Sequence, residues 1–432
     1  MKLEVEIIST ETIKPSSPTP HHLRHYQLSF LDQISPPVYN PLILFYPSDQ
    51  INNNITEFSN VENHYDHLKQ SLSEVLTCFY PLAGRIKDNV FIDCNDQGIP
   101  FKKARVKSQL SDHLQNPVPG EHNKLLPLPL DDAGELPVGI QFNIFNCGGI
   151  AISVLISHKV GDALSFFTFV KSWAAIARGE RDTVRVEFVS AVLFPPKNIS
   201  GFKPNTGITK ENIAIKRFVF SAQKIEEIRA KYTDTKSLEN QKRPSRVEAL
   251  SAFMWSRFVA ATKGSESGPD HKFHAVVHAV NLRPRIEPPL PDYSFGNLYR
   301  IAMTIPSMET DHEECYDLIS QMRESLSKVN KEYVKKLQDG NEHLDFIKER
   351  AERFLTGEMV SLNFTSLCRF PLYEADFSWG KPVWVGSARL TFKNLVTFMD
   401  TVSGDGIEAW INLRDEDMAK FEIDEELLAF VD

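Results

Sequence analysis

The 432-residue sequence lacks the features that mark membrane, secreted and nucleic-acid-binding proteins. No stretch approaches the ~18 apolar residues of a membrane helix, and the start, MKLEVEIIST, has no apolar run of signal-peptide length. The five cysteines are scattered and form no CxxC pair, so neither a disulfide framework nor a zinc site is expected. Lys and Arg number 48 against 57 Asp and Glu, and this net charge of −9 disfavours a general nucleic-acid binder. These absences predict a cytoplasmic protein without a metal and without a membrane or nucleic-acid partner.

Several common catalytic signatures are missing as well. The sequence contains no G-x-S-x-G elbow of a serine hydrolase, no GxGxxG and no P-loop. The paired histidines His21 and His22 lie in a predicted N-terminal loop without a metal-ligand partner pattern. An acyl-enzyme hydrolase and the common nucleotide-binding folds are therefore disfavoured.

What is present is an ordinary globular composition, with 42% apolar and 24% charged residues. The length is two to three times the ~150 residues of a typical domain. Strand-like and helix-like stretches alternate throughout, which predicts an α/β protein. A stretch with three prolines and little periodicity near residue 205 is typical of a linker. We therefore expect an N-terminal domain over residues 1–195, a crossover linker over 196–212 and a C-terminal domain over 213–432.

One short segment combines a strand end, a tight turn and a helix start. Two strands are predicted, over 138–145 and 150–157, and the second runs directly into His158-Lys-Val-Gly-Asp162. Neutral imidazole has the basicity to accept a proton from a substrate hydroxyl near pH 7, so His158 is a candidate general base. The alternative is a histidine that only bonds its neighbours. Asp162 has an equally plain structural explanation, because it can cap the following helix.

A second segment, Asp376-Phe-Ser-Trp-Gly380 followed by Lys-Pro382, combines an acid, two aromatic residues and a turn. Taken alone, it favours a well-packed structural turn.

Together these features resemble the BAHD acyltransferases, plant enzymes that transfer acyl groups from coenzyme A. His158-x-x-x-Asp162 and Asp376–Gly380 stand where that family has its two signature motifs, although the family has Gly where this chain has Ser378. Five further blocks follow in family-like order and spacing: 79–85 (FYPLAGR), 93–98 (DCNDQG), 281–285 (NLRPR), 295–297 (FGN) and 403–410 (SGDGIEAW). Within the family, Pro15 to Pro20, Leu31-Asp-Gln33 and Ala163 are most similar to the branch of alkaloid acetyltransferases.

The resemblance implies a two-domain fold like that of chloramphenicol acetyltransferase. Each domain would have a mixed sheet with flanking helices, and an active-site channel would run between the domains. It assigns a catalytic set of His158, Thr365 and Asp376. His158 would deprotonate the acceptor hydroxyl, Thr365 would donate to the oxyanion, and Asp376 would act by shaping the coenzyme channel from a distance. Leu367 stands where relatives have a Trp.

The resemblance also assigns supporting residues. Asp162 would be structural and would pair with Arg283, so that Asp162→Ala harms folding more than chemistry. Coenzyme A carries several phosphates, and the segments that line its pocket in relatives supply five residues here: Ser245, Arg246, Arg285, Ser366 and Arg369.

The predicted function is acetyl transfer from acetyl-CoA to a hydroxyl of a plant specialised metabolite, an alkaloid or a terpenoid, by a monomeric enzyme. Two alternatives stay open. One is the same fold with an aromatic or longer acyl donor, and the other is a catalytically silent relative that binds a metabolite or a partner protein.

Overall fold

The computed structural model describes residues 2–48, 57–115, 117–131, 133–199, 208, 213–233, 243–262, 273–306, 314–339 and 359–432. The chain divides into two compact units, each built from three segments. Unit 1 comprises Met1–Asn205, Leu290–Leu298 and Phe370–Leu390, and unit 2 comprises Thr206–Pro289, Tyr299–Arg369 and Thr391–Asp432.

Unit 1 is built on a six-stranded sheet in the order β1-β6-β7-β8-β3-β13. Its strands are β1 (Val5–Ile13), β3 (Tyr39–Tyr46), β6 (Ile99–Val106), β7 (Val138–Phe145), β8 (Ile150–Ser157) and β13 (Trp384–Gly386). The pair β6–β7 is parallel and the others are antiparallel, so the sheet is mixed. A smaller sheet contains β2 (His25–Gln27), β5 (Phe91–Asp93) and β4 (Arg85–Lys87).

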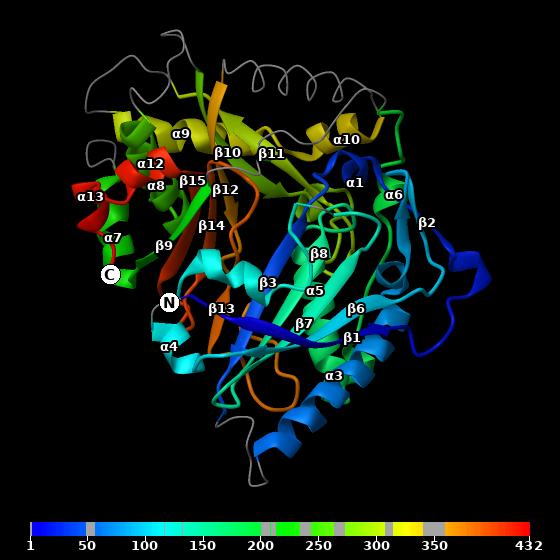
Figure 1. Ribbon diagram of the computed structural model, residues 1–432. Coiled ribbons are helices and arrows are strands. Elements are labelled where there is room, and N and C mark those ends of the chain that lie inside the picture. The colour runs from blue at the N-terminus through cyan, green and yellow to red at the C-terminus, as the bar shows by residue number, and fades with distance from the viewer. Residues whose placement is uncertain are drawn as a thin grey trace. The chain divides into compact units, whose positions relative to one another are not determined.

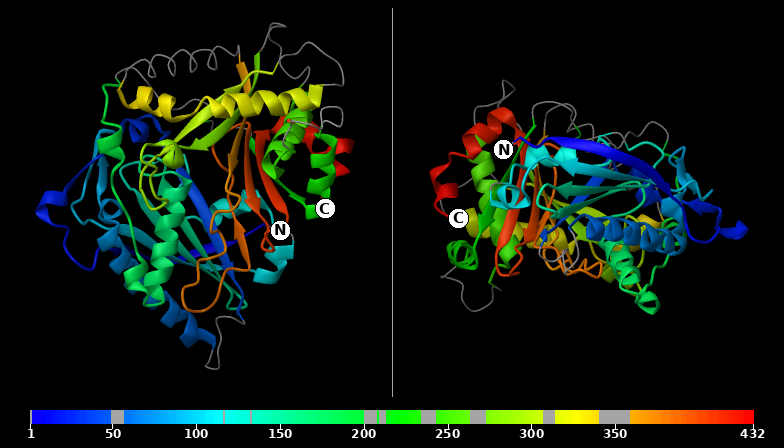
Figure 2. Two further views of the ribbon diagram at one scale, coloured as in Figure 1. Left: turned by 180° about the vertical axis from the view of Figure 1, so that it is seen from behind. Right: turned by 60° about the horizontal axis from the view of Figure 1, so that its bottom comes forward.

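Two long helices cover one face of the large sheet of unit 1. They are α3 (Glu57–Cys78) and α5 (Ala163–Ala177), which pack against each other (Figure 1; Figure 2). Trp173 of α5 donates its indole N–H to Ser71 Oγ of α3 at 3.1 Å. All eight residues of β8 are buried, which explains its nearly continuous apolar sequence. Shorter helices are α1 (Phe30–Ile34), α4 (Leu110–Gln115) and α6 (Ser190–Leu193).

Unit 2 has its own six-stranded mixed sheet, in the order β11-β10-β12-β14-β15-β9. The strands are β9 (Ile213–Phe220), β10 (Phe273–Asn281), β11 (Tyr299–Thr304), β12 (Met359–Ser366), β14 (Leu395–Asp400) and β15 (Ile407–Arg414). Strand β12 pairs in parallel with both β10 and β14, and the other pairs are antiparallel.

The core of unit 2 lies between this sheet and a layer of helices (Figure 1). The helices of this unit are α7 (Ala222–Lys231), α8 (Arg246–Thr262), α9 (Glu314–Ser327), α10 (Lys331–Asp339), α12 (Asp415–Phe421) and α13 (Glu425–Leu428). All of them except α10 contribute apolar residues to the core. On β15 the core residues are Ile407, Ala409, Ile411 and Leu413, which is the two-residue period of a strand with one face on the core.

Several expectations meet the structure here. The strands predicted over 138–145 and 150–157 are confirmed with the same bounds. The segment with the 376–380 motif was expected in the C-terminal domain, and that placement is wrong. It belongs to unit 1, because β13 pairs with β3 through Trp384 and Phe45. Most of the predicted linker over 196–212 lies outside the described residues.

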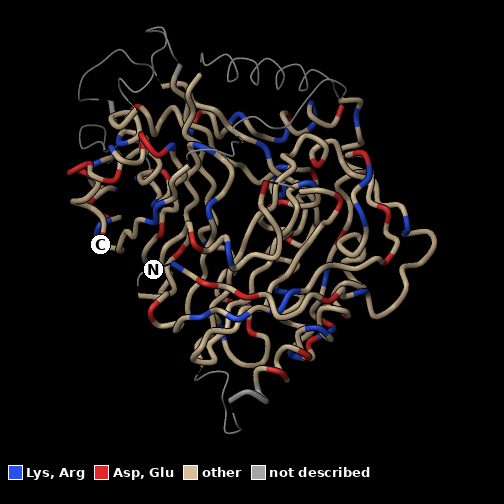
Figure 3. Tube along the Cα trace, in the orientation of Figure 1, with Lys and Arg blue, Asp and Glu red and all other residues tan. Residues whose placement is uncertain are grey.

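Two further features of the fold are the distribution of its charged residues and the length of its helices. Lys and Arg are interspersed with Asp and Glu along the described part of the chain in both units (Figure 3). Among the described residues, no helix is both long enough and apolar enough to cross a bilayer.

Candidate active site

His158 lies directly after β8, at the start of the turn that leads into α5. Its backbone N–H donates to Val38 O at 2.8 Å, which fixes the main chain at this point. The side chain is partly buried, and burial lowers the pKa of His158 below its ordinary value, although Asp162 opposes this shift. The imidazole is therefore neutral at physiological pH, the form that can accept a proton.

Asn297 sets which imidazole nitrogen of His158 can accept that proton. Asn297 Nδ2 faces two acceptors, Asp32 Oδ1 at 2.9 Å and the carbonyl oxygen of His158 at 2.8 Å, so it must be the NH₂ end of the amide. The other end, Asn297 Oδ1, lies 3.0 Å from His158 Nδ1. Because Oδ1 can only accept, Nδ1 carries the hydrogen and Nε2 is the unprotonated nitrogen. The neighbours of the ring thus leave Nε2 as the nitrogen that can accept a proton.

Asp32 lies behind Asn297 and is fully buried. Its Oδ1 accepts from both the backbone N–H and Nδ2 of Asn297, each at 2.9 Å. Its Oδ2 accepts from the backbone N–H and the hydroxyl of Ser29, at 2.9 and 2.6 Å, in a capping box at the start of α1. Burial raises the pKa of Asp32, and these hydrogen bonds oppose the rise. All four contacts come from donors, which suits an ionised carboxylate.

Lys159, the residue after His158, is also buried. Its ammonium donates to Gln33 O at 2.8 Å, on the same helix as Asp32. Burial lowers the pKa of Lys159 to about 7, and the charge of Asp32 acts against that shift.

Asp162 caps α5, as one of the two sequence-based explanations predicts. Its Oδ1 accepts from Ser165 N at 2.9 Å, and its Oδ2 accepts from Leu298 N at 3.1 Å. The carboxylate therefore joins the helix start to the segment that carries Asn297. The predicted partner, Arg283, is buried in unit 2, where its side chain also contacts Asn281 Oδ1, and the Asp162–Arg283 pair stays a prediction.

Asp376 organises a turn of unit 1. Its Oδ1 accepts from Ser378 N and from Gly380 N, both at 2.9 Å. Its carbonyl oxygen accepts from Arg178 at 2.6 Å. These three bonds fix the backbone of the turn.

Ser378, the departure from the family motif, has a φ of 86°, in the left-handed region that favours glycine. Its hydroxyl donates to Ala177 O at the end of α5, at 3.0 Å, and this bond offsets part of the strain.

A basic pocket of about 720 Å³ lies in unit 2. It contains four of the five residues predicted to bind the coenzyme, which come from two separate stretches of chain: Ser245, Arg246, Ser366 and Arg369. The rest of the lining is Arg229, Arg243, Val247, Glu248, Arg323 and Cys368. Five arginines against one glutamate make this a local positive site on a chain of net charge −9.

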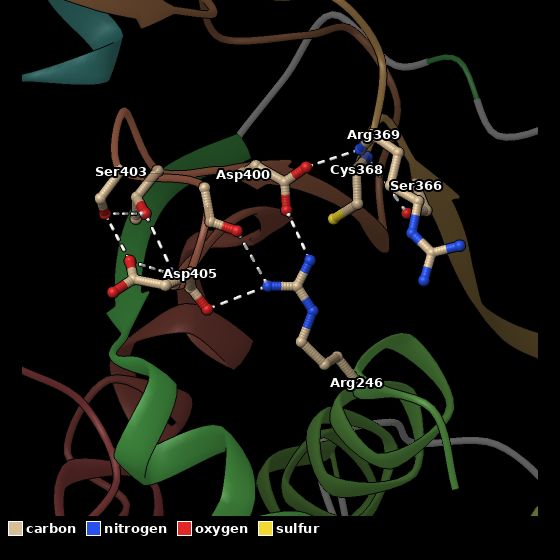
Figure 4. Close-up of polar contacts among 10 residues, drawn as sticks. Arg246, Ser366, Cys368, Arg369, Asp400, Ser403 and Asp405 are labelled. Carbon is tan, nitrogen blue, oxygen red and sulfur yellow. Dashed lines mark hydrogen bonds and ion pairs between the residues drawn. The ribbon is translucent and has the colours of Figure 1, made fainter.

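Arg246 and Arg369 make their contacts in this pocket with different groups, Arg246 with its side chain and Arg369 with its backbone (Figure 4). The guanidinium of Arg246 donates to Asp400 Oδ1 at 3.0 Å and to the carbonyl oxygens of Gly404 and Asp405 at 3.3 and 2.9 Å. It thereby holds the turn after β14. Arg369 uses its backbone N–H to bond Asp400 Oδ2 at 2.6 Å, and its side chain is exposed.

The remaining pocket arginines are paired with carboxylates. Arg323 donates to both oxygens of Glu248, at 2.8 and 3.0 Å. Burial raises the pKa of Glu248, but hydrogen bonds from Arg323 and Ser245 lower it to about 2. Arg229 and Arg243 both pair with Glu226. Among the described residues, none pairs with the side chain of Arg369, so its guanidinium is the one that can turn to a ligand without losing a partner.

Thr365 and Arg285 are the two remaining residues that the sequence predicts for the site. Thr365 is partly exposed and lies next to Ser366 on β12, opposite Thr397 of β14. Arg285 is not among the described residues that line the basic pocket, and it donates to Asn281 O at 2.7 Å.

No role for Asn297, Asp32 or Asp400 follows from the sequence alone. Asn297 and Asp32 do lie in the blocks 295–297 and 31–33, which resemble the family and could have marked both residues. Nothing in the sequence distinguishes Asp400 from the other acidic residues.

Known proteins are similar to this chain over nearly its full length. The profile described as Transferase family matches residues 3–428. Stemmadenine O-acetyltransferase of Catharanthus roseus is 40% identical over 432 residues, which cover 98% of this chain and 97% of that protein. Vinorine synthase of Rauvolfia serpentina is 39% identical over 440 residues, covering 100% and 99%. Limonoid 21-O-acetyltransferase of Melia azedarach is 36% identical over 436 residues, covering 99% and 98%.

The crystal structure of vinorine synthase matches the structure with a TM-score of 0.84, at 37% identity over 99% of both chains. This match confirms the fold expected from the sequence, with two sheet-rich domains and flanking helices.

Proposed function

Because this chain belongs to the Transferase family, the BAHD acyltransferases, we propose that it transfers an acetyl group from acetyl-CoA to a hydroxyl of a plant alkaloid or terpenoid. The observation that carries the catalytic part of the proposal is the hydrogen bond between His158 Nδ1 and Asn297 Oδ1, which leaves Nε2 as a neutral base.

The reaction is a direct displacement. His158 Nε2 accepts the proton of the acceptor hydroxyl while its oxygen attacks the thioester carbonyl carbon. The tetrahedral intermediate collapses with cleavage of the C–S bond, and the proton on His158 passes to the leaving thiolate of CoA. Products are the acetyl ester and free CoA, and His158 returns to its neutral form. No covalent acyl-enzyme is required.

The oxyanion of the intermediate needs a preorganised donor. Thr365 is our candidate, because it is a partly exposed residue with a hydroxyl at the end of β12, beside Ser366 of the basic pocket. Leu367 has no N–H on its side chain, so it cannot supply the indole donor that relatives place there.

The basic pocket suits the phosphates of CoA. Arg369 carries the exposed guanidinium for a charge-assisted bond to phosphate, and Ser245 and Ser366 add hydroxyls. Arg246 contributes positive charge while it holds the turn at 404–405. The assignment of Arg285 to coenzyme binding rests on the family resemblance alone.

The test is a turnover assay. Purified protein is incubated with acetyl-CoA and a panel of hydroxylated alkaloids and triterpenoids, and release of free CoA thiol is followed. We expect acceptor-dependent thiol release that His158→Ala abolishes. Full activity of His158→Ala contradicts the mechanism, and absence of turnover with every acceptor favours a silent metabolite-binding relative. A parallel panel of benzoyl-CoA and longer acyl-CoA donors decides the donor.

We also propose a cytoplasmic location and a monomeric state. Cys78, Cys94, Cys147 and Cys368 are all free thiols, which suits a reducing compartment. Fractionation of plant cells and sedimentation of the purified protein test these two points.

A further inference from the structure

The hydrogen bonds around Asn297 raise the question of what prevents its amide from turning over. The backbone on both sides is fixed to the start of α5. Gly296 N–H donates to Ser165 Oγ at 3.0 Å, its carbonyl accepts from the same hydroxyl at 2.9 Å, and Leu298 N–H donates to Asp162. The remaining freedom is a half-turn of the amide, which would exchange Oδ1 and Nδ2.

Such a half-turn would reverse the tautomer of His158. With Nδ2 of Asn297 facing the ring, His158 Nδ1 would have to accept, and the hydrogen would move to Nε2. The nitrogen proposed as the base would then be protonated and unable to accept a proton from the acceptor hydroxyl. The orientation of one buried amide therefore decides whether the base is available.

We propose that Asp32 is a positioning residue for catalysis: its carboxylate holds the amide of Asn297 in the orientation that keeps His158 in the Nδ1–H tautomer. The proposal rests on the proposed role of His158 as general base. Oδ1 of Asp32 accepts from the backbone and the side chain of Asn297 at once, so it fixes the NH₂ end on its own side. The carbonyl oxygen of His158 supports the same orientation at 2.8 Å.

The surroundings of Asp32 suit this role, because its two oxygens face only donors. A carboxamide at this position must turn its own NH₂ toward one pair of donors. If it faces Asn297, the amide of Asn297 is driven to flip. If it faces Ser29, the start of α1 loses its capping box. A carboxylate meets both demands and the isosteric amide does not.

The chain offers a matched control in Ser29. Its hydroxyl donates to Asp32 Oδ2 at 2.6 Å and accepts from Asp32 N at 3.1 Å. Ser29→Ala therefore weakens the same capping box from its other side and leaves both contacts between Asp32 and Asn297 in place. It reports the effect of loosening α1 alone.

The experiment measures tautomer and kinetics together. Protein labelled with ¹⁵N at histidine is studied by two-bond ¹H–¹⁵N correlation, and His158→Ala identifies the signals of His158. We expect a protonated Nδ1 and an unprotonated Nε2 in the native protein and in Ser29→Ala. In Asp32→Asn we expect a mixture of tautomers, kcat at least tenfold lower, and KM for acetyl-CoA within twofold of the native value. Ser29→Ala keeps kcat within twofold.

A second variant, Asp32→Ala, covers the case in which Asp32→Asn does not fold. A water in the vacated space can both donate and accept, so it permits the flipped amide and the same mixture of tautomers is expected. The proposal is overturned if a folded Asp32 variant keeps the pure Nδ1–H tautomer and kcat within twofold. It is also overturned, without any variant, if native His158 carries its hydrogen on Nε2.

The two proposals fail separately. The spectra need no acceptor, so a tautomer that responds to Asp32 in a protein without transferase activity overturns the proposed function and leaves intact only the control of the His158 tautomer by Asp32. Turnover that depends on His158 but not on Asp32 overturns only the positioning role.

Discussion

The two regions proposed to form the site are built from opposite kinds of interaction. In unit 1, His158, Asn297 and Asp32 form a buried network of hydrogen bonds of 2.9 to 3.0 Å in which each donor faces an acceptor. In unit 2, the pocket is strongly charged, and most of its arginines pair with Glu226, Glu248 or Asp400. Figure 4 shows the pair of Arg246 and Asp400.

The difference matches the roles that we propose for the two regions. A general base must present one atom in one protonation state, which requires fixed directions and exclusion of water. A phosphate site must offer charge, and charge acts over several ångströms and tolerates imperfect geometry. We therefore expect changes in unit 1 to alter kcat and changes in the pocket of unit 2 to alter KM for acetyl-CoA.

The largest effect is expected for the base itself. His158→Ala removes the group that accepts the hydroxyl proton and lowers kcat by about 10²–10⁴-fold. KM for acetyl-CoA and the midpoint of urea unfolding stay close to those of the native protein. His22→Ala, an exposed histidine of unit 1, is the control and leaves kcat unchanged.

The pH profile sharpens this prediction. Burial lowers the pKa of His158 below its ordinary value, so the basic form predominates at pH 7. We expect kcat/KM to fall at low pH as the imidazole takes a proton, with the midpoint of the fall below the ordinary value of about 6.5. A midpoint above pH 7 contradicts this assignment.

A buried histidine pair provides the next largest effect, on stability. His122 Nδ1 donates to Ser387 O at 2.5 Å, so its Nε2 accepts from His113 Nε2 at 3.0 Å. Burial lowers the pKa of His113 to about 4. Unfolded histidine titrates near 6.5, so the unfolded state binds more protons than the folded state between pH 6.5 and pH 4. The free energy of unfolding therefore decreases as the pH is lowered through that window.

The loss for His113 amounts to about 3 kcal/mol, from roughly 1.36 kcal/mol per pKa unit. His113→Gln can still donate to His122 but cannot titrate, so the decline in the free energy of unfolding between pH 7 and pH 4.5 becomes shallower. Urea unfolding at the two pH values measures this. An unchanged slope in His113→Gln, with His22→Gln as the exposed control, shows that other groups dominate.

Whether the sequence predicts a contact in these regions depends on how far apart the two residues lie in the sequence. The strands at 138–145 and 150–157 and the cap at Asp162 are local, so periodicity and residue type sufficed. His158 was recognised by its motif. Its partners lie far away in sequence: Asn297 is 139 positions from His158 and 265 from Asp32. No local pattern reports such a contact.

Arg246 illustrates a second limit. Its position in a family-like segment correctly predicted a place in the basic pocket. It did not predict that Asp400 and two carbonyl oxygens occupy the guanidinium, because residue type gives the charge of a side chain and not its partners.

A smaller effect is expected in unit 2. Arg369→Ala removes the exposed guanidinium and raises KM for acetyl-CoA about tenfold, since a hydrogen bond to a charged group contributes about 1.5–3 kcal/mol. The value of kcat stays within twofold. Arg181→Ala, an exposed arginine of unit 1 that pairs with Glu74, is the matched control and changes neither constant. A fall in kcat without a change in KM would contradict the division of labour between the two units.

The smallest effect is expected at the turn that Asp376 organises. Ser378→Gly relieves the strain of a φ of 86° but removes the hydrogen bond to Ala177 O. The strain costs about 1–3 kcal/mol and the bond contributes about 0.5–1.5 kcal/mol. The two oppose each other, so we expect the free energy of unfolding to rise by no more than about 1 kcal/mol, with kcat unchanged.

Gly380→Ala is the contrasting change at the same turn. Gly380 has a φ of 105° and no side chain that could compensate for strain. An added Cβ therefore destabilises unit 1 by about 1–3 kcal/mol. Urea unfolding of the two variants and the native protein measures both changes in the free energy of unfolding. If Ser378→Gly destabilises as much as Gly380→Ala, the bond to Ala177 outweighs the strain, and Ser378 ties the turn to α5 more strongly than its backbone opposes it.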